Sequence, residues 1–169
     1  MLKKCFFLLL MMGMLTGCAS PTFETLGDVP HQQVAAPTPR KVVLTLPEEA
    51  HQAMWSQDGN TIYLCDDYTI HLQTLQASDL QSSIRQISGF DREKLTVLES
   101  ACTDHDRYEW VWTAPGEGGD AVFRCVLLSD GDFHYALTVS ADADDAGSLT
   151  EQWNALLGSF CLEKTVESQ

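Results

Sequence analysis

Hydrophobic and polar residues alternate with a period of two in several short stretches between residues 41 and 140, a pattern typical of β-strands. These stretches are residues 42–46, 62–65, 69–73, 95–99, 108–113, 121–128 and 133–140. Pro47 ends the first of them, and Asp66-Asp67 separates the second and third as a hairpin turn. The last four follow one another with short connections, which predicts a four-strand antiparallel meander.

Two other stretches have the 3.6-residue period of amphipathic helices. The first helix is predicted to open at Ser78, with Gln81 as its capping-box partner, and to end at Gly89. The second is predicted to open at Ser148, with Glu151 as its partner. The apolar stripes consist of Leu80, Ile84 and Ile87 in the first helix and of Leu149, Trp153, Leu156, Leu157 and Phe160 in the second. The second stripe is broad enough to cover a sheet face.

The clearest hairpin turn of the chain lies between the last two strands, where Asp130-Gly131 suits a two-residue type I′ loop. With this loop, Leu128 faces Phe133 and Arg124 faces Leu137. The alternating aromatic residues of the preceding strand are expected on the same face: Tyr108, Trp110 and Trp112. The C-terminal helix is expected to cover this apolar face, which gives an α+β domain with a mostly antiparallel sheet.

Arg124 is the unusual residue on this predicted face, because it would lie beside Trp110. One interpretation is a ligand-binding cation in an aromatic-lined pocket. In the other, which we favour, the side-chain stem packs on Trp110 while the guanidinium reaches water or a carboxylate.

The N-terminus has the form of a signal peptide, with Lys3 and Lys4 before apolar residues 5–15. This apolar run is too short to span a bilayer. Leu15-Thr16-Gly17-Cys18, directly after it, resembles the lipobox of bacterial lipoprotein precursors. The resemblance implies removal of residues 1–17 and attachment of fatty acyl chains such as palmitate to Cys18. The alternatives are an ordinary secretory signal with an incidental cysteine, or a buried helix.

The expected location is therefore the extracytoplasmic face of a membrane, with lipid on Cys18 as the anchor. Each buried methylene contributes roughly 0.8 kcal/mol, so two or three acyl chains hold a protein at a membrane essentially permanently. Ala19 follows the cysteine, where aspartate commonly signals inner-membrane retention. An outer-membrane destination is thus open if the cell has a second membrane.

The domain boundaries follow from composition. Residues 18–40 contain four prolines among small and polar residues, which indicates a flexible tether after the lipidated cysteine. Residues 41–163 are expected to form a single α+β domain, since about 125 residues suit one hydrophobic core. Residues 164–169 remain as a short C-terminal tail.

The mature chain is strongly acidic. Without Lys3 and Lys4 it has eight basic residues against 24 acidic ones, a net charge of −16 with neutral histidines. Such a chain is repelled by phosphate backbones and by anionic lipid head groups. We therefore expect no nucleic-acid partner, and a domain that stands off the membrane surface.

Four cysteines remain in the domain: Cys65, Cys102, Cys125 and Cys161. An even number in an oxidising compartment predicts two disulfides. Cys102 and Cys125 are expected on strands that flank a common neighbour, ~9.6 Å apart at ~4.8 Å per strand. Because a disulfide needs Cα atoms within about 7 Å, that pairing is disfavoured, and Cys102 is left to pair with Cys65 or Cys161. Buried free thiols are the competing interpretation.

Motifs for catalysis or cofactor binding are not found. The five histidines have no metal-ligand spacing, and no nucleophile elbow, phosphate loop or dinucleotide fingerprint occurs. Residues 142–147 alternate carboxylates before a glycine, but they lack the full spacing of a calcium loop. We expect no metal, no cofactor and no enzymatic activity.

The element order, with a terminal helix and its closing segment Trp153-Asn154-Ala155-Leu156-Leu157-Gly158-Ser159-Phe160, resembles the PsbP-like fold. The preceding strand Tyr135-Ala136-Leu137-Thr138-Val139 is similar too, and the resemblance covers residues 42–162. It implies an αβα sandwich and no catalytic residues. Functions on this fold include photosystem assembly, small-GTPase binding and those of bacterial lipoproteins, so the fold leaves function open.

The sequence thus predicts a membrane-anchored extracytoplasmic lipoprotein that acts as a non-enzymatic binding or assembly module at the cell envelope. Its expected partners are membrane lipid, through acylated Cys18, and an envelope protein. The main alternative is a small-solute binding lipoprotein that uses the aromatic-lined sheet face, with Arg124 and Trp110 in its pocket. A hydrolase of unrecognised type is the weaker alternative.

Overall fold

The computed structural model of this chain describes residues 36–55, 59–116 and 119–164. Pro37–Gln169 form one compact unit, with which the following description is concerned. Cys18, the predicted signal peptide and nearly all of the predicted tether lie outside the described residues. No helix in the described part has both the length and the apolar character that crossing a membrane requires.

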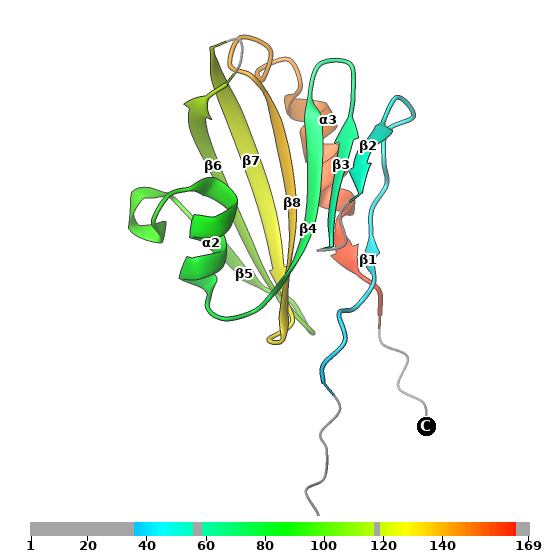
Figure 1. Ribbon diagram of the computed structural model, residues 1–169, viewed down its shortest axis with the longest axis vertical. Helices are drawn as coiled ribbons and strands as arrows, with labels where there is room; N and C mark the ends of the chain where they lie inside the picture. The colour runs from blue at the N-terminus through cyan, green and yellow to red at the C-terminus, as the bar shows by residue number, and fades with distance from the viewer. Residues whose placement is uncertain (1–35, 56–58, 117–118, 165–169) are drawn as a thin grey trace, which may run out of the picture. The chain divides into compact units, whose positions relative to one another are not determined.

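A seven-stranded antiparallel sheet is the framework of the unit, in the order β2-β3-β4-β8-β7-β6-β5 (Figure 1). Its strands are β2 (His51–Trp55), β3 (Asn60–Leu64), β4 (Thr69–Gln76), β5 (Leu98–Ala101), β6 (Asp106–Pro115), β7 (Asp120–Ser129) and β8 (Phe133–Asp142). The predicted hairpin is β3–β4, and the predicted four-strand meander is β5 to β8, although β5 covers residues 98–101 rather than the predicted 95–99. The prediction of an α+β domain with a mostly antiparallel sheet is confirmed.

A second, two-stranded sheet pairs β1 (Val42–Val43) with β9 (Cys161–Leu162). The predicted first strand over residues 42–46 is shorter than expected, because the Thr45 N–H donates to Ser159 Oγ, at 3.0 Å, instead of joining a strand. Neither β9 nor the edge strand β2 was predicted. β2 is interrupted by a register shift between Gln52 and Met54, and its sequence has no regular alternation.

Helix α2 (Leu80–Ser88) is followed by the short 3-10 helix η1 (Arg92–Lys94). Its N-cap is Asp79, whose Oδ1 accepts from the Ser82 N–H at 2.8 Å. The predicted Ser78–Gln81 capping box is therefore wrong by one residue, since the Asp79 carboxylate bonds both the N–H and the hydroxyl of Ser82. Gly89 ends the helix as predicted, with a φ of 78° that favours glycine.

Helix α3 (Thr150–Ser159) follows a run of turns after β8. Leu149 is its N-cap, without a side-chain capping bond, because the Ser148 hydroxyl donates to Asp145 O in the preceding turn at 2.7 Å. The predicted Ser148–Glu151 capping box is therefore wrong. The predicted apolar stripe is confirmed, since all five of its residues are buried: Leu149, Trp153, Leu156, Leu157 and Phe160.

The sheet has a buried cluster on each face. Figure 1 shows α2 in front of the sheet and α3 behind it. The α3 stripe packs with β-strand residues that include Val126, Leu137 and Val139. On the α2 side, Ile84 packs with Cys125, Leu127, Ala136 and the aromatic residues of β6: Tyr108, Trp110 and Trp112.

The register between β7 and β8 differs from the predicted one by two residues: Leu128 lies opposite Tyr135, and Arg124 opposite Val139. Gly131, with a φ of 97°, and the residue after it are the central residues of the turn. Asp130 instead begins the turn, where its carboxylate accepts from the N–H groups of residues 132 and 133 at 3.1 and 2.8 Å. Because the shift is two residues, each side chain keeps its face.

The first and last described segments meet at one end of the sheet. The Glu163 N–H donates to Lys41 O at 2.8 Å, and Arg40 Nη2 donates to Glu163 O at 2.6 Å. The Arg40 N–H also donates to the Tyr135 hydroxyl, which donates to Asp130 in the β7–β8 turn. The chain therefore enters and leaves the domain beside the β7–β8 turn.

Candidate functional site

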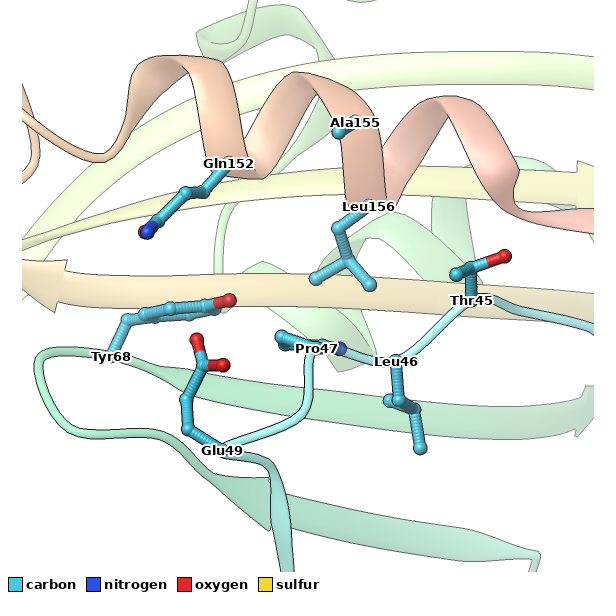
Figure 2. A pocket seen from close by; sticks show the side chains of 8 residues that line it. All are labelled: Thr45, Leu46, Pro47, Glu49, Tyr68, Gln152, Ala155 and Leu156. Atoms are coloured by element: carbon cyan, nitrogen blue, oxygen red, sulfur yellow. The ribbon is translucent and has the colours of Figure 1, made fainter.

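An apolar groove lies between α3 and the segment that connects β1 to β2. It encloses about 310 Å³. The groove residues are Thr45, Leu46, Pro47, Glu49, Tyr68, Gln152, Ala155 and Leu156. In the view of Figure 2 the Tyr68 ring lies between the Glu49 carboxylate and the Gln152 amide, with Leu156 and Pro47 beyond its hydroxyl end. Polar groups thus gather at the Tyr68 end of an otherwise apolar site.

The connecting segment is shaped by two bonds. The Thr45 N–H bonds the hydroxyl of Ser159 at the end of α3, and the Ala50 N–H donates to Pro47 O at 3.1 Å in a tight turn. Leu44 and Leu46 pack against the core below α3. These contacts hold the segment alongside the helix, so residues far apart in the sequence form one site.

Tyr68 forms the wall of the groove on its polar side. Its side chain is buried, and its ring lies 6.4 Å from that of Trp153. Burial raises the pKa of Tyr68, and a hydrogen bond to the Cys65 side chain raises it further. Burial also raises the pKa of the Cys65 thiol. Both groups are therefore protonated at neutral pH, which suits binding rather than proton transfer or nucleophilic attack.

Two acidic cavities continue from Tyr68 toward the β3–β4 and β6–β7 turns. The first, of about 520 Å³, is also lined by Tyr68 and contains four carboxylates: Asp66, Asp67, Asp142 and Asp145. The second, of about 490 Å³, shares Asp142 and Asp145 and adds Asp120 and Asp144. No ion pair within the described residues involves Glu49 or any of these six aspartates.

This charge is concentrated in part of the chain. Residues 44–84 contain six acidic residues and residues 125–163 contain seven, yet neither segment contains a lysine or an arginine. The groove is built entirely from these two segments. The groove was not predicted from the sequence, in which the absence of basic residues from these two segments is the available signal.

Arg124 and Trp110, the predicted ligand-pocket residues, point to opposite faces of the sheet. Trp110 lies opposite Cys125, and its side chain packs under α2, whereas Arg124 lies opposite Val111 on the α3 side. The predicted shared face is wrong because the sheet has two apolar faces, and alternation alone does not distinguish them. A cavity of about 330 Å³ borders both residues.

The Arg124 guanidinium reaches a carboxylate, as the second interpretation predicted, but the predicted packing of its stem on Trp110 is wrong, because the two side chains lie on opposite faces. It donates to Asn154 Oδ1 at 2.5 Å and to Glu109 Oε2 at 3.4 Å. Burial acts to raise the pKa of Glu109, but Arg107 and Arg124 outweigh it and lower that pKa. The Glu109 carboxylate therefore neutralises part of the positive charge of Arg124, which would have to attract a ligand.

The four domain cysteines are free thiols in the structure. β6 lies between the strands of Cys102 and Cys125, as the argument against their pairing assumed. Cys65, beside β3, is five strand positions from β5, or about 24 Å at ~4.8 Å per strand, so it does not meet Cys102. Cys125 is fully buried, whereas Cys102 and Cys161 are exposed. The structure thus does not support the prediction of two disulfides.

Titratable groups elsewhere in the described part of the chain include the exposed Asp104–His105 pair, at 2.8 Å, and a buried Ser–His pair. No cluster of three or more His, Cys, Asp or Glu side chains there is arranged to hold a metal ion. Ser83 Oγ and His134 Nδ1 lie 2.7 Å apart, but both side chains are buried between α2 and the sheet. This Ser–His pair is therefore closed to a substrate.

Comparisons with known proteins place this architecture among PsbP-like folds. No protein-family model and no curated protein matches the chain. The structure of CyanoP, the cyanobacterial PsbP of Synechocystis sp. PCC 6803, is similar with a TM-score of 0.55 and 10% identity, over 72% of this chain and 86% of that one.

Two further solved structures are similar. LpqN of Mycobacterium tuberculosis, described as involved in cell envelope biogenesis, gives a TM-score of 0.50 with 14% identity, over 76% of this chain and 86% of LpqN. A protein from Bacteroides thetaiotaomicron gives 0.51 with 11% identity over 76% of this chain, which spans only 47% of that protein. The PsbP-like fold that the sequence resemblance implied is thus supported, and the ligand is left open.

Proposed function

We propose that the chain is a lipoprotein anchored at the extracytoplasmic face of a membrane through Cys18, and that its PsbP-like domain binds an envelope protein without catalysing a reaction. Lipid on Cys18 is the anchor, because the acidic domain is repelled by anionic head groups. The likeness of fold to LpqN, described as involved in cell envelope biogenesis, supports an envelope role.

The observation that carries the proposal is the separation of two ends of the domain. Arg40, where the chain enters, lies beside the β7–β8 turn. The acidic cavities lie at the other ends of the same strands, where Thr69 pairs with Ser140 and Ala121 with Asp142. The point at which the chain enters the domain, at Arg40, therefore lies at the opposite ends of these strands from the acidic cavities, and it does not cover them.

The test is extraction of the full chain from native membranes, with Cys18→Ala as the variant and Cys5→Ala as the control. Wild type and Cys5→Ala are expected to resist high salt and alkaline carbonate, and to carry acyl mass on Cys18. Cys18→Ala is expected in the soluble fraction. An unmodified Cys18 in the wild-type chain contradicts the anchor.

Crosslinking in the same membranes tests the binding role. A specific protein crosslinked to the domain supports it. Recovery of a bound small solute, with no protein partner, supports the small-solute alternative instead.

A further inference from the structure

We infer that the groove between α3 and residues 45–49 binds an extended segment of a partner protein, in which an apolar side chain stands next to lysine or arginine residues. This inference deepens the proposed binding function. It rests on that function, because the proposed function is what makes the partner a protein. It names the chemistry of that partner.

The apolar component of the ligand follows from the groove walls. Leu46, Pro47, Ala155 and Leu156 line the cavity, and Leu156 belongs to the buried core beneath it. A cavity of about 310 Å³ lies at the lower limit of the roughly 300–1,000 Å³ that small-molecule pockets occupy. It has room for an apolar side chain of a peptide.

The cationic component follows from the charge around the groove. Glu49 lies in the groove itself, and six aspartates line the two cavities beyond Tyr68. The chain supplies no basic residue from either segment that builds the groove. A basic partner segment is therefore complementary, and the field of these carboxylates would speed its association at low salt.

The extended form of the ligand follows from the way the cavities are linked. Tyr68 lines both the groove and the first acidic cavity, and Asp142 and Asp145 line both acidic cavities. The three spaces thus lie next to one another along the surface. A peptide can place an apolar residue in the groove and basic residues along the aspartates.

Charge also argues against the other occupants. A second copy of this chain carries a formal net charge of −14 over its full sequence. Phosphate-rich ligands would be repelled in the same way. A basic protein segment is the occupant that both the walls and the charge favour.

The test is fluorescence anisotropy with the full chain as purified from its native membrane in detergent, whether or not Cys18 carries lipid. The probe is a ten-residue peptide of alternating leucine and lysine. Two matched peptides replace lysine by glutamate or leucine by serine. Only the leucine–lysine peptide is expected to bind well, and its affinity is expected to fall as salt rises from low to physiological strength.

Three variants separate the contributions. Glu49→Gln is expected to weaken binding about fivefold at low salt, whereas Glu48→Gln, next to it but outside the groove, leaves the affinity unchanged. Ala155→Phe fills the groove from an exposed helix position and is expected to abolish binding. Circular dichroism checks that this variant folds, and Glu49→Gln tests the site independently of it.

The inference is overturned if the glutamate peptide binds equally well, or if the Glu49 and Glu48 variants behave alike. It is also overturned if decyltrimethylammonium alone binds as tightly as the peptide, or if sedimentation shows a dimer that Ala155→Phe dissociates. These readouts do not depend on acylation of Cys18. A failure of the groove is thus distinguishable from a failure of the anchor.

Discussion

The ring of Tyr68 packs on the indole of Trp153, with ring centroids 6.4 Å apart and planes inclined at 60°. Tyr68 comes from the β3–β4 turn and Trp153 from the first turns of α3, and both are buried. This contact fixes the wall of the groove against the helix. We therefore expect the stability of the domain and the shape of the groove to depend on the same pair of side chains.

Truncation of Trp153 tests this packing. Trp153→Ala is expected to lower the free energy of unfolding by about 3–5 kcal/mol, the range for loss of a buried aromatic side chain. Glu151→Ala, at an exposed position of the same helix, is expected to leave it nearly unchanged. Urea denaturation followed by far-UV circular dichroism measures both. Equal midpoints for the two variants would show that α3 is not packed as described.

The cap of α2 offers a test that distinguishes the sequence prediction from the structure. Asp79→Ala removes the acceptor of the Ser82 N–H, so a lower midpoint of urea denaturation is expected. Ser78→Ala, at the residue that the sequence predicted as the cap, is expected to leave the midpoint unchanged. The opposite ranking of the two variants would restore the Ser78 capping box.

The buried His134 predicts a loss of stability in mild acid. Burial lowers its pKa below the ordinary value of 6.5, against the opposing charges of Asp130 and Asp79. The unfolded chain then takes up a proton at a higher pH than the folded chain does. The stability from neutral His134 is present above pH 6.5 and declines as the pH falls below it.

Urea denaturation at pH 7.5 and pH 5.5 measures this effect in wild type and in His134→Gln. The variant is expected to lose less stability between the two pH values, since glutamine does not titrate. The same measurement on His71→Gln shows how much His71 contributes to the pH dependence, because burial lowers the pKa of His71 as well. A His134→Gln variant with the pH dependence of wild type would contradict the assignment.

Thiol reactivity tests the state of the cysteines. Cys102 and Cys161 are expected to react rapidly with a maleimide in the native protein, and Cys65, which is partly buried, more slowly. Burial raises the pKa of Cys125 to about 12, so this residue is expected to react only after unfolding. Peptide mass spectrometry resolves each site. A disulfide-linked pair of peptides would show instead that the sequence prediction of disulfides was correct.

The sequence predicted those features of the fold that depend on neighbouring residues. The α3 stripe from Leu149 to Phe160 and the end of α2 at Gly89 follow from local periodicity and backbone preference. Arg124 lies on the face that α3 covers, as predicted, but the face of the β6 aromatic residues was not predictable in this way, because both faces of the meander are apolar and either fits the alternation.

The groove could not be predicted from local sequence patterns, for a different reason. Its walls come from residues 45–49, Tyr68 and α3, which are far apart in the sequence and are brought together in the folded domain, where β1 pairs with β9. The bond from Thr45 to Ser159 that holds the connecting segment joins residues 114 positions apart. The feature of the sequence that agrees with the basic partner we propose is the distribution of charge, since residues 44–84 and 125–163 contain no lysine or arginine.

The most direct test of an anchored binding module is site-specific photo-crosslinking in intact cells. A photoreactive residue is placed at Gln152 in the groove or, as a control, at Arg92 in η1, outside the groove residues. The binding proposal predicts a discrete protein adduct from position 152, recovered in the membrane fraction with acylated Cys18, and none from position 92. Identical adducts from both positions, or none from position 152 in membrane-bound protein, would contradict it.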